Sequence, residues 1–254
     1  MRKDVNSIAD GLIVFASVFG GALGGILLRG ALPSDHLSSE SKDVVKMSMG
    51  LVTTMAALVL GLLVSSAKSF YDAQSNELTQ MSARVILLDR ILAHYGTETM
   101  EVRDLLRRTI ADSIDRIWPE ERTPSKLGVP PTGPEALIDK IQELSPKDEK
   151  QRALQGQALS AVAGLMQTRW LMYEQGTNSV SVPMLVILIF WLAAIFTSFG
   201  LFAPRNATVM TALFVAGGAV SGAIFLILEM YAPFGGLIKL SSAPLRTALI
   251  QLGQ

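Results

Sequence analysis

MSMGLVTTMAALVLGLLVSSA, residues 47–67, is an apolar run that contains no charged side chain. A helix needs about 20 mostly apolar residues to cross a bilayer. Three further segments meet this requirement, at residues 11–28, 180–202 and 207–228. Four such segments in a chain in which only 17% of the residues are charged predict an integral membrane protein with four helical spans.

The first apolar segment has a second interpretation, as a secretory signal, because Arg2 and Lys3 precede it. Against this, Arg29 stands where cleavage needs a small residue, and the apolar run is longer than a signal core. We therefore interpret residues 11–28 as a retained span.

Residues 68–178 form a polar middle segment whose periodicity is helical. Its first part has apolar residues at alternating spacings of three and four, as in a coiled-coil seam. These residues are Leu78, Met81, Val85, Leu88, Leu92 and Tyr95. No glycine or proline separates this seam from the second span, so we expect one long helix to contain both.

Three more helices are expected in the middle segment. The apolar pattern predicts one at about residues 98–117, a short one from Pro134 to Leu144 and a long one to about Glu174. Ser145 is expected to be the N-cap of the long helix, with Asp148 as its capping-box acid. With no strand pattern, the predicted fold class is all-α.

The chain is expected to have four parts. They are an N-terminal transmembrane hairpin (1–67), a cytoplasmic helical region (68–178), a C-terminal transmembrane hairpin (179–231) and a cytoplasmic tail (232–254). The side with both termini carries the near-membrane residues Arg2, Lys3, Lys68, Arg84, Arg169, Lys239 and Arg246, and the other side Arg29, Lys42, Lys46 and Arg205. The basic excess predicts cytoplasmic termini in a multi-pass protein of the plasma membrane, the inner membrane of a bacterium.

Small residues recur in two of the spans at the spacing that lets helix backbones approach in lipid. Overlapping GxxxG patterns in the first span involve Gly20, Gly21, Gly24 and Gly25, and the fourth span has Gly218 and Gly222. They predict close helix packing rather than a specific activity.

The second span has one stripe that is relevant to function. Thr54, Leu58 and Leu62 are each four residues apart. If several copies of this helix surround an axis, the stripe forms one hydroxyl ring and two apolar rings, and a narrow apolar ring gates ions by dewetting. The alternative is that the stripe packs against neighbouring helices or faces lipid.

Ionisable groups near the cytoplasmic ends of the spans are a second candidate feature. Asp10 directly precedes the first apolar segment and Glu229 directly follows the fourth, and Lys68 and Asp72 follow the second span. Because charges in a membrane are costly, such groups mark either an ion path or an interfacial pair. Lys68 is the expected partner of Asp10 or Glu229.

Several classes of function have no support in the sequence. The chain has no cysteine and two histidines, so thiolate, disulfide and zinc chemistry are not expected. The net charge is zero, which gives no indication of a nucleic-acid partner. Without a catalytic or nucleotide-binding motif, we expect no enzyme activity, no cofactor and no metal site.

Two stretches resemble a known family. Residues 58–92 combine Leu60-Gly61 inside an apolar helix with the aromatic–acidic pair Tyr71-Asp72. Residues 228–249 contain an acid, a P-F-G element and a P-L element, at Glu229, Pro233-Phe234-Gly235 and Pro244-Leu245. Together with the four-span plan, they are similar to the bestrophin-like domain of bacterial and plant membrane proteins, and more distantly to bestrophin channels.

The resemblance implies a homo-oligomer, a pentamer in bestrophins, that binds the bilayer and inorganic ions. The path through such channels lies on the axis, and its hydrophobic neck on the second helix would fall at Thr54, Leu58 and Leu62. This neck is not aromatic, and Ser69–Asp72 replaces the tryptophan-rich run of bestrophins. No acid follows Glu229, so calcium gating is not expected.

A different function stays open from the sequence. The chain can also be interpreted as a non-conducting scaffold or signalling protein, in which the seam from Leu78 to Tyr95 binds a partner helix.

Overall fold

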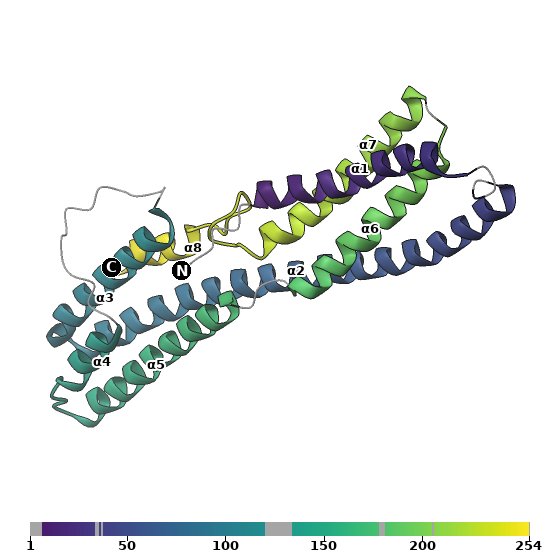
Figure 1. The fold of residues 1–254 in the computed structure, drawn as a ribbon. Helices are drawn as coiled ribbons and strands as arrows, with labels where there is room; N and C mark the ends of the chain where they lie inside the picture. Colours follow the sequence, from purple (N-terminus) through teal and green to yellow (C-terminus); the bar gives the residue numbers. More distant parts are fainter. Residues whose placement is uncertain are drawn as a thin grey trace. The chain divides into compact units, whose positions relative to one another are not determined.

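Most of the residues that the structure describes are helical. The computed structural model describes residues 7–33, 36, 38–119, 134–177, 181–204 and 206–253, with no strand in these ranges. The α-helices are α1 (Ser7–Ala31), α2 (Ser39–Tyr95), α3 (Met100–Ile117), α4 (Pro134–Gln142), α5 (Glu149–Thr177), α6 (Val182–Phe202), α7 (Ala207–Met230) and α8 (Ala243–Gln251) (Figure 1). A 3₁₀ turn, η2 (Thr97–Thr99), precedes α3. The predicted all-α fold class is confirmed.

Four helices are long and apolar enough to cross a membrane, namely α1, α2, α6 and α7. α1, α2 and α7 contain three of the predicted spans, and α6 covers the fourth from residue 182, since residue 180 lies outside the described residues. The prediction of a membrane-type helical protein is confirmed. The second span is only part of α2, which runs through 57 residues without interruption. The long helix inferred from the absence of glycine and proline after residue 61 is therefore present.

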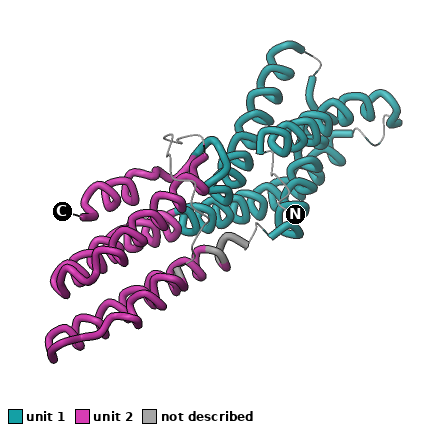
Figure 2. Tube along the Cα trace, turned by 90° about the vertical axis from the view of Figure 1, so that its left-hand side faces the viewer, with its two compact units in different colours: residues 1–71, 179–238 teal, residues 72–178, 239–254 magenta. Residues whose placement is uncertain are grey.

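The chain divides into two compact units, coloured separately in Figure 2. Unit 1 comprises residues 1–71 and 179–238, and unit 2 comprises residues 72–178 and 239–254. The predicted tail, 232–254, is thus divided between them. Arg2, Lys3 and Arg205, which the orientation argument uses, lie outside the described residues.

Unit 1 is built on direct backbone contact between α1 and α6. A methyl group added at Gly25 would overlap the carbonyl oxygen of Thr197, and one added at Gly200 would overlap that of Ala22. Gly21 also faces α6, whereas Gly20, Gly24, Gly218 and Gly222 have no atom within 4 Å of such a methyl. Of the two overlapping glycine registers in α1, the contact with α6 thus uses Gly21 and Gly25.

Aromatic side chains join α1 to α7 in the same unit. Phe15 and Phe19 stack with ring centroids 5.6 Å apart, and the Phe214 ring meets both edge-on at 5.2 and 5.5 Å. Such pairs add about 0.5–1.5 kcal/mol to ordinary burial. At the far ends of the helices, Arg29 donates to the carbonyl oxygen of Ala203 at 2.6 Å, which satisfies a free acceptor after α6.

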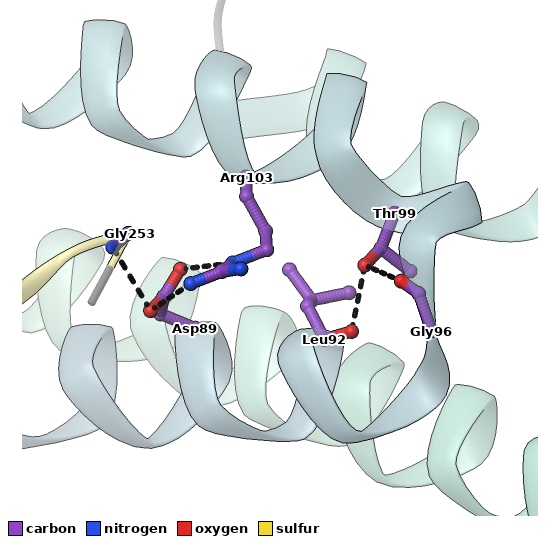
Figure 3. Close-up of polar contacts among 6 residues, drawn as sticks. All are labelled: Asp89, Leu92, Gly96, Thr99, Arg103 and Gly253. Atoms are coloured by element: carbon purple, nitrogen blue, oxygen red, sulfur yellow. Dashed lines mark hydrogen bonds and ion pairs between the residues drawn. The ribbon is translucent and has the colours of Figure 1, made fainter.

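Unit 2 contains the C-terminal part of α2, from Asp72 to Tyr95, and the turn that follows it. Gly96 has φ 137°, a conformation that favours glycine, and it reverses the chain. The Thr99 hydroxyl holds the turn closed by donating towards the carbonyl oxygens of Leu92 at 2.6 Å and Gly96 at 2.8 Å (Figure 3). The turn places α3 against α2.

A buried ion pair links three segments of unit 2. Asp89, on α2, is 1% exposed, and it accepts from Arg103 Nε at 2.7 Å and Nη2 at 2.9 Å. The backbone N–H of Gly253 donates to the same carboxylate at 3.3 Å (Figure 3). At the other end of α3, the indole N–H of Trp118 donates to the carbonyl oxygen of Leu240 at 2.8 Å. The C-terminal segment is therefore part of the core of unit 2.

The predicted coiled-coil seam is covered by the chain itself. Its buried members are Leu78, Val85, Leu88, Leu92 and Tyr95, and Met81 is half-buried. Polar contacts accompany this packing, since Arg84 donates to the carbonyl oxygen of Gly164 at 2.6 Å and to the Thr168 hydroxyl at 2.8 Å. This face of α2 has no room for a partner helix.

The start of α5 differs from the prediction. The helix begins at Glu149, and Asp148 caps it by accepting from the backbone N–H of Gln151 at 2.6 Å. The Gln151 side chain in turn accepts from the N–H of Lys147 at 2.8 Å. The prediction that Ser145 is the N-cap was wrong, because the capping side chain belongs to Asp148, three residues later. The Lys147 ammonium donates to Glu98 and holds the pKa of that carboxyl below its usual value.

The α1–α6 contact predicts that alanine substitutions at the adjacent residues Gly24 and Gly25 have very different effects on stability. Gly25→Ala and Gly200→Ala should each lower the free energy of unfolding in detergent by about 1–3 kcal/mol, because the added methyl forces two backbones apart. Gly24→Ala is the matched control, since its methyl enters open space. Equal stability of the Gly24 and Gly25 variants in denaturant titrations would contradict the contact.

The buried ion pair gives a second prediction. Asp89→Asn should destabilise unit 2 by about 3 kcal/mol, the low end for breaking a buried pair, because Arg103 keeps some contact with water. Unfolding followed by tryptophan fluorescence measures the change, since Trp118 is buried in the same unit. Asp104→Asn, at an exposed position on α3, should leave stability within about 0.5 kcal/mol of the wild type.

Candidate functional site

The predicted stripe on α2 faces away from the rest of unit 1. Leu58 is 67% exposed and Leu62 is 62% exposed, and Thr54 is exposed as well. The buried residues of this part of α2 are Ala56, Leu63 and Ala67. Nine residues make about two and a half helical turns, so Thr54 is diametrically opposite Leu63, and Leu58 is opposite Ala67. One face of the helix is thus packed and the other is uncovered.

Two contacts fix the rotation of α2 just beyond this stripe. The Ser66 hydroxyl and the Tyr231 hydroxyl are 3.0 Å apart, within hydrogen-bond distance. The ring of Phe70 stacks on the ring of Tyr231 with centroids 5.1 Å apart. Both contacts join α2 to the end of α7 within unit 1. They hold the helix so that the stripe of Thr54, Leu58 and Leu62 stays on its uncovered side.

The hydroxyl of Thr54 presents an acceptor on the uncovered face. Its proton is donated along the helix to the carbonyl oxygen of Gly50 at 3.1 Å, and Thr53 donates likewise to Met49 at 2.7 Å. A threonine oxygen that donates in this way keeps its lone pairs. Copies of the helix placed around an axis would therefore present oxygen acceptors above two levels of leucine.

Glu229 has a different environment from the predicted one. It is 2% exposed, and its carboxylate accepts from the backbone N–H groups of Leu237 and, at 3.1 Å, Ile238. A side chain at Gly236 would collide with this carboxylate, so the glycine lets the turn close over it. The turn after α7 thus supplies two backbone donors to Glu229, and the predicted pairing with Lys68 stays a prediction.

The other predicted ionisable residues differ from Glu229 in exposure or surroundings. Asp10 is half-buried in the first turn of α1, and the Lys68 ammonium lies 6.0 Å from the centre of the Tyr71 ring. Asp72 is half-buried and belongs to unit 2. Within the described ranges, no three His, Cys, Asp or Glu side chains come close enough to hold a metal ion.

Sequence reasoning did not identify Tyr231 and Gly236 as residues that shape this region. Tyr231 contacts Ser66 and Phe70, which precede it by more than 150 residues, so no local pattern relates them. Gly236 directly follows the P-F-G element, so that Gly235 and Gly236 are adjacent. This glycine pair was the available sequence signal for a tight turn over a buried group.

The comparisons with known proteins agree with the features described so far. A family model for the bestrophin-like domain matches residues 16–245, which include α1 from residue 16, all of α2, α6 and α7, the α2 stripe and the Glu229 turn. No curated protein and no solved structure matches the chain. Because the family model covers most of the chain, the protein belongs to the bestrophin-like family.

Proposed function

We propose that the protein is an ion channel in which several copies of the chain surround an axis, with Thr54, Leu58 and Leu62 of each α2 facing that axis. The observation that carries the proposal is that this stripe is uncovered by its own chain while the opposite face of α2 is buried. Membership of the bestrophin-like family supports a channel-like function. The resemblance to bestrophins suggests five copies in the ring.

Leu58 and Leu62 would act as the gate of this channel. A narrow ring of leucine side chains offers water no hydrogen bonds, so the pore empties and ions meet a barrier. Thr54, one turn away, would offer oxygen atoms to a partly dehydrated ion. Widening the apolar ring should therefore increase conduction, whereas the threonine ring affects which ions enter.

The basic residues near the ends of the spans support an orientation for the proposed channel. Unit 2 and both termini would lie in the cytoplasm of a cell whose plasma membrane holds unit 1. The helices of unit 2 would then surround a vestibule on the cytoplasmic side. The seam from Leu78 to Tyr95 is buried in the single chain, which weakens the scaffold hypothesis that it binds a partner helix.

Lipid is the competing explanation for the exposed leucines, because the acyl chains of a bilayer accept apolar side chains readily. Leu12 on α1 has nearly the same exposed fraction as Leu62, 63% against 62%. If both simply face lipid, truncating either one should have the same small effect. If the α2 leucines form a gate, only their truncation should change ion flux.

Ion flux from proteoliposomes tests this proposal directly. Leu58→Ala and Leu62→Ala should each raise flux several-fold over the wild type, because a wider ring stays wet. Potassium and chloride released from loaded vesicles are followed separately with ion-selective electrodes. Leu12→Ala is the matched control and should leave both fluxes unchanged. Flux that is negligible in the wild type and in both α2 variants would reject the channel.

The mass of the detergent-solubilised protein gives an independent prediction. Native mass spectrometry should find a closed ring of about five copies, since closed symmetry is the usual form of a homo-oligomer. A stable monomer or dimer would remove the only geometry in which Thr54, Leu58 and Leu62 enclose a path.

A further inference from the structure

A polar recess lies between α2 and α5 within unit 2. Its volume is about 440 Å³, inside the range of roughly 300–1,000 Å³ that small-molecule sites occupy. The lining surface is mostly polar, so a molecule that fills the recess must itself be polar. The lining residues are Arg84 on α2 and one face of α5, namely Ser160, Ala161, Ala163, Gly164 and Gln167.

Arg84 is the only charged residue that lines this recess among the residues that the structure describes. Its Nη1 atom donates to the carbonyl oxygen of Gly164 at 2.6 Å and to the hydroxyl oxygen of Thr168 at 2.8 Å. The Thr168 hydroxyl gives its own proton to the same carbonyl oxygen at 3.0 Å, so its oxygen is an acceptor for Arg84. Because Thr168 is buried and both acceptors belong to α5, they hold the guanidinium in one orientation.

The glycine at position 164 favours this arrangement. A methyl group added at Gly164 would lie 3.1 Å from Nη1 of Arg84, which is a tight contact. Without a side chain at this position, the guanidinium reaches the backbone of α5 directly. The position of the cation in the recess is therefore set by the α5 backbone.

One edge of this guanidinium is available to a ligand. Within the described ranges, Arg84 donates through Nη1 alone, which leaves the N–H groups of Nε and Nη2 facing outward from that contact. Arg103, in the same unit, shows what this edge can bind. Its Nε and Nη2 atoms hold the two carboxylate oxygens of Asp89 at 2.7 and 2.9 Å. In the described part of the chain, no acid forms the corresponding pair with Arg84.

We propose that the recess binds a small monocarboxylate that also carries hydroxyl groups, with its carboxylate on the Nε–Nη2 edge of Arg84. A planar carboxylate matches this edge with two parallel hydrogen bonds, and its single negative charge equals the single positive charge of the site. Ser160 and Gln167 are exposed and lie seven residues apart, on the same face of α5, where they can bind the hydroxyl groups. Binding at this site goes beyond the proposed channel function and does not depend on it.

Isothermal titration calorimetry of the full chain in detergent tests the site. Sodium gluconate, a monocarboxylate with hydroxyl groups along its chain, should bind saturably at one site per chain. Sodium acetate, which has the carboxylate alone, should bind several-fold more weakly. Sodium phosphate at the same ionic strength should also bind more weakly than gluconate, because its second charge has no partner in the recess.

Substitution of the arginine tests its planar edge. Arg84→Lys keeps the positive charge but cannot form two parallel hydrogen bonds, so it should weaken gluconate binding about tenfold. Arg152→Lys, at an exposed position on α5 outside the recess, is the matched control and should bind gluconate as the wild type does.

A second pair of variants leaves the contacts between Arg84 and α5 in place. Ala163→Glu adds a carboxylate of the chain itself to the recess and should weaken gluconate binding several-fold, because the two carboxylates compete for Arg84. Ala153→Glu, also exposed on α5 but outside the recess, should leave binding unchanged. The melting temperature of each variant shows whether it is folded.

Three results would overturn the proposed site. One is the absence of saturable binding of both gluconate and acetate to the wild type. Another is tighter binding of phosphate than of gluconate, which would replace the carboxylate by a phosphate as the ligand group. The third is wild-type affinity for gluconate in a folded Arg84→Lys or Ala163→Glu variant.

Discussion

The architecture of unit 1 depends on one constraint, which is that its other helices cover only one side of α2. Ala56, Leu63 and Ala67 are buried on that side, whereas Leu58 and Leu62 are exposed. In the apolar part, the uncovered side needs either lipid or other copies of the chain. In unit 2, the uncovered side is polar and needs water.

The packing of unit 1 explains how this face stays uncovered. The closest backbone approach is between α1 and α6, through Gly25 and Gly200, where neither position tolerates a methyl group. Phenylalanine rings then attach α7 to α1. Because α1, α6 and α7 pack against one another, only one side of α2 is buried in unit 1. Tyr231 sets the rotation of α2 through its contacts with Ser66 and Phe70.

Much of the fold was predictable because it depends on local sequence. Apolar runs of membrane length are sufficient to identify the four spans, and helical continuity follows from the absence of glycine and proline after Gly61. The same reasoning could not choose between the glycine registers of α1, since both have the required spacing. Only the position of α6 distinguishes Gly25, whose added methyl would meet a backbone, from Gly24, whose methyl would meet nothing.

The contacts that escaped prediction are those whose donors belong to the backbone or come from distant segments. Glu229 is satisfied by main-chain N–H groups, which leave no side-chain signal in the sequence. Asp89 accepts from Arg103 and from Gly253, and the latter lies 164 residues further along the chain.

Exposed leucines alone do not distinguish a pore from a lipid-facing surface, because both environments accept them at little cost. The rotation of α2 is more informative, since Tyr231 contacts Ser66 and Phe70 and thereby fixes which side of the helix is covered. Leu58 and Leu62 lie one helical turn apart on the side that is left uncovered. A pore requires this alignment along one direction of α2, whereas contact with lipid does not.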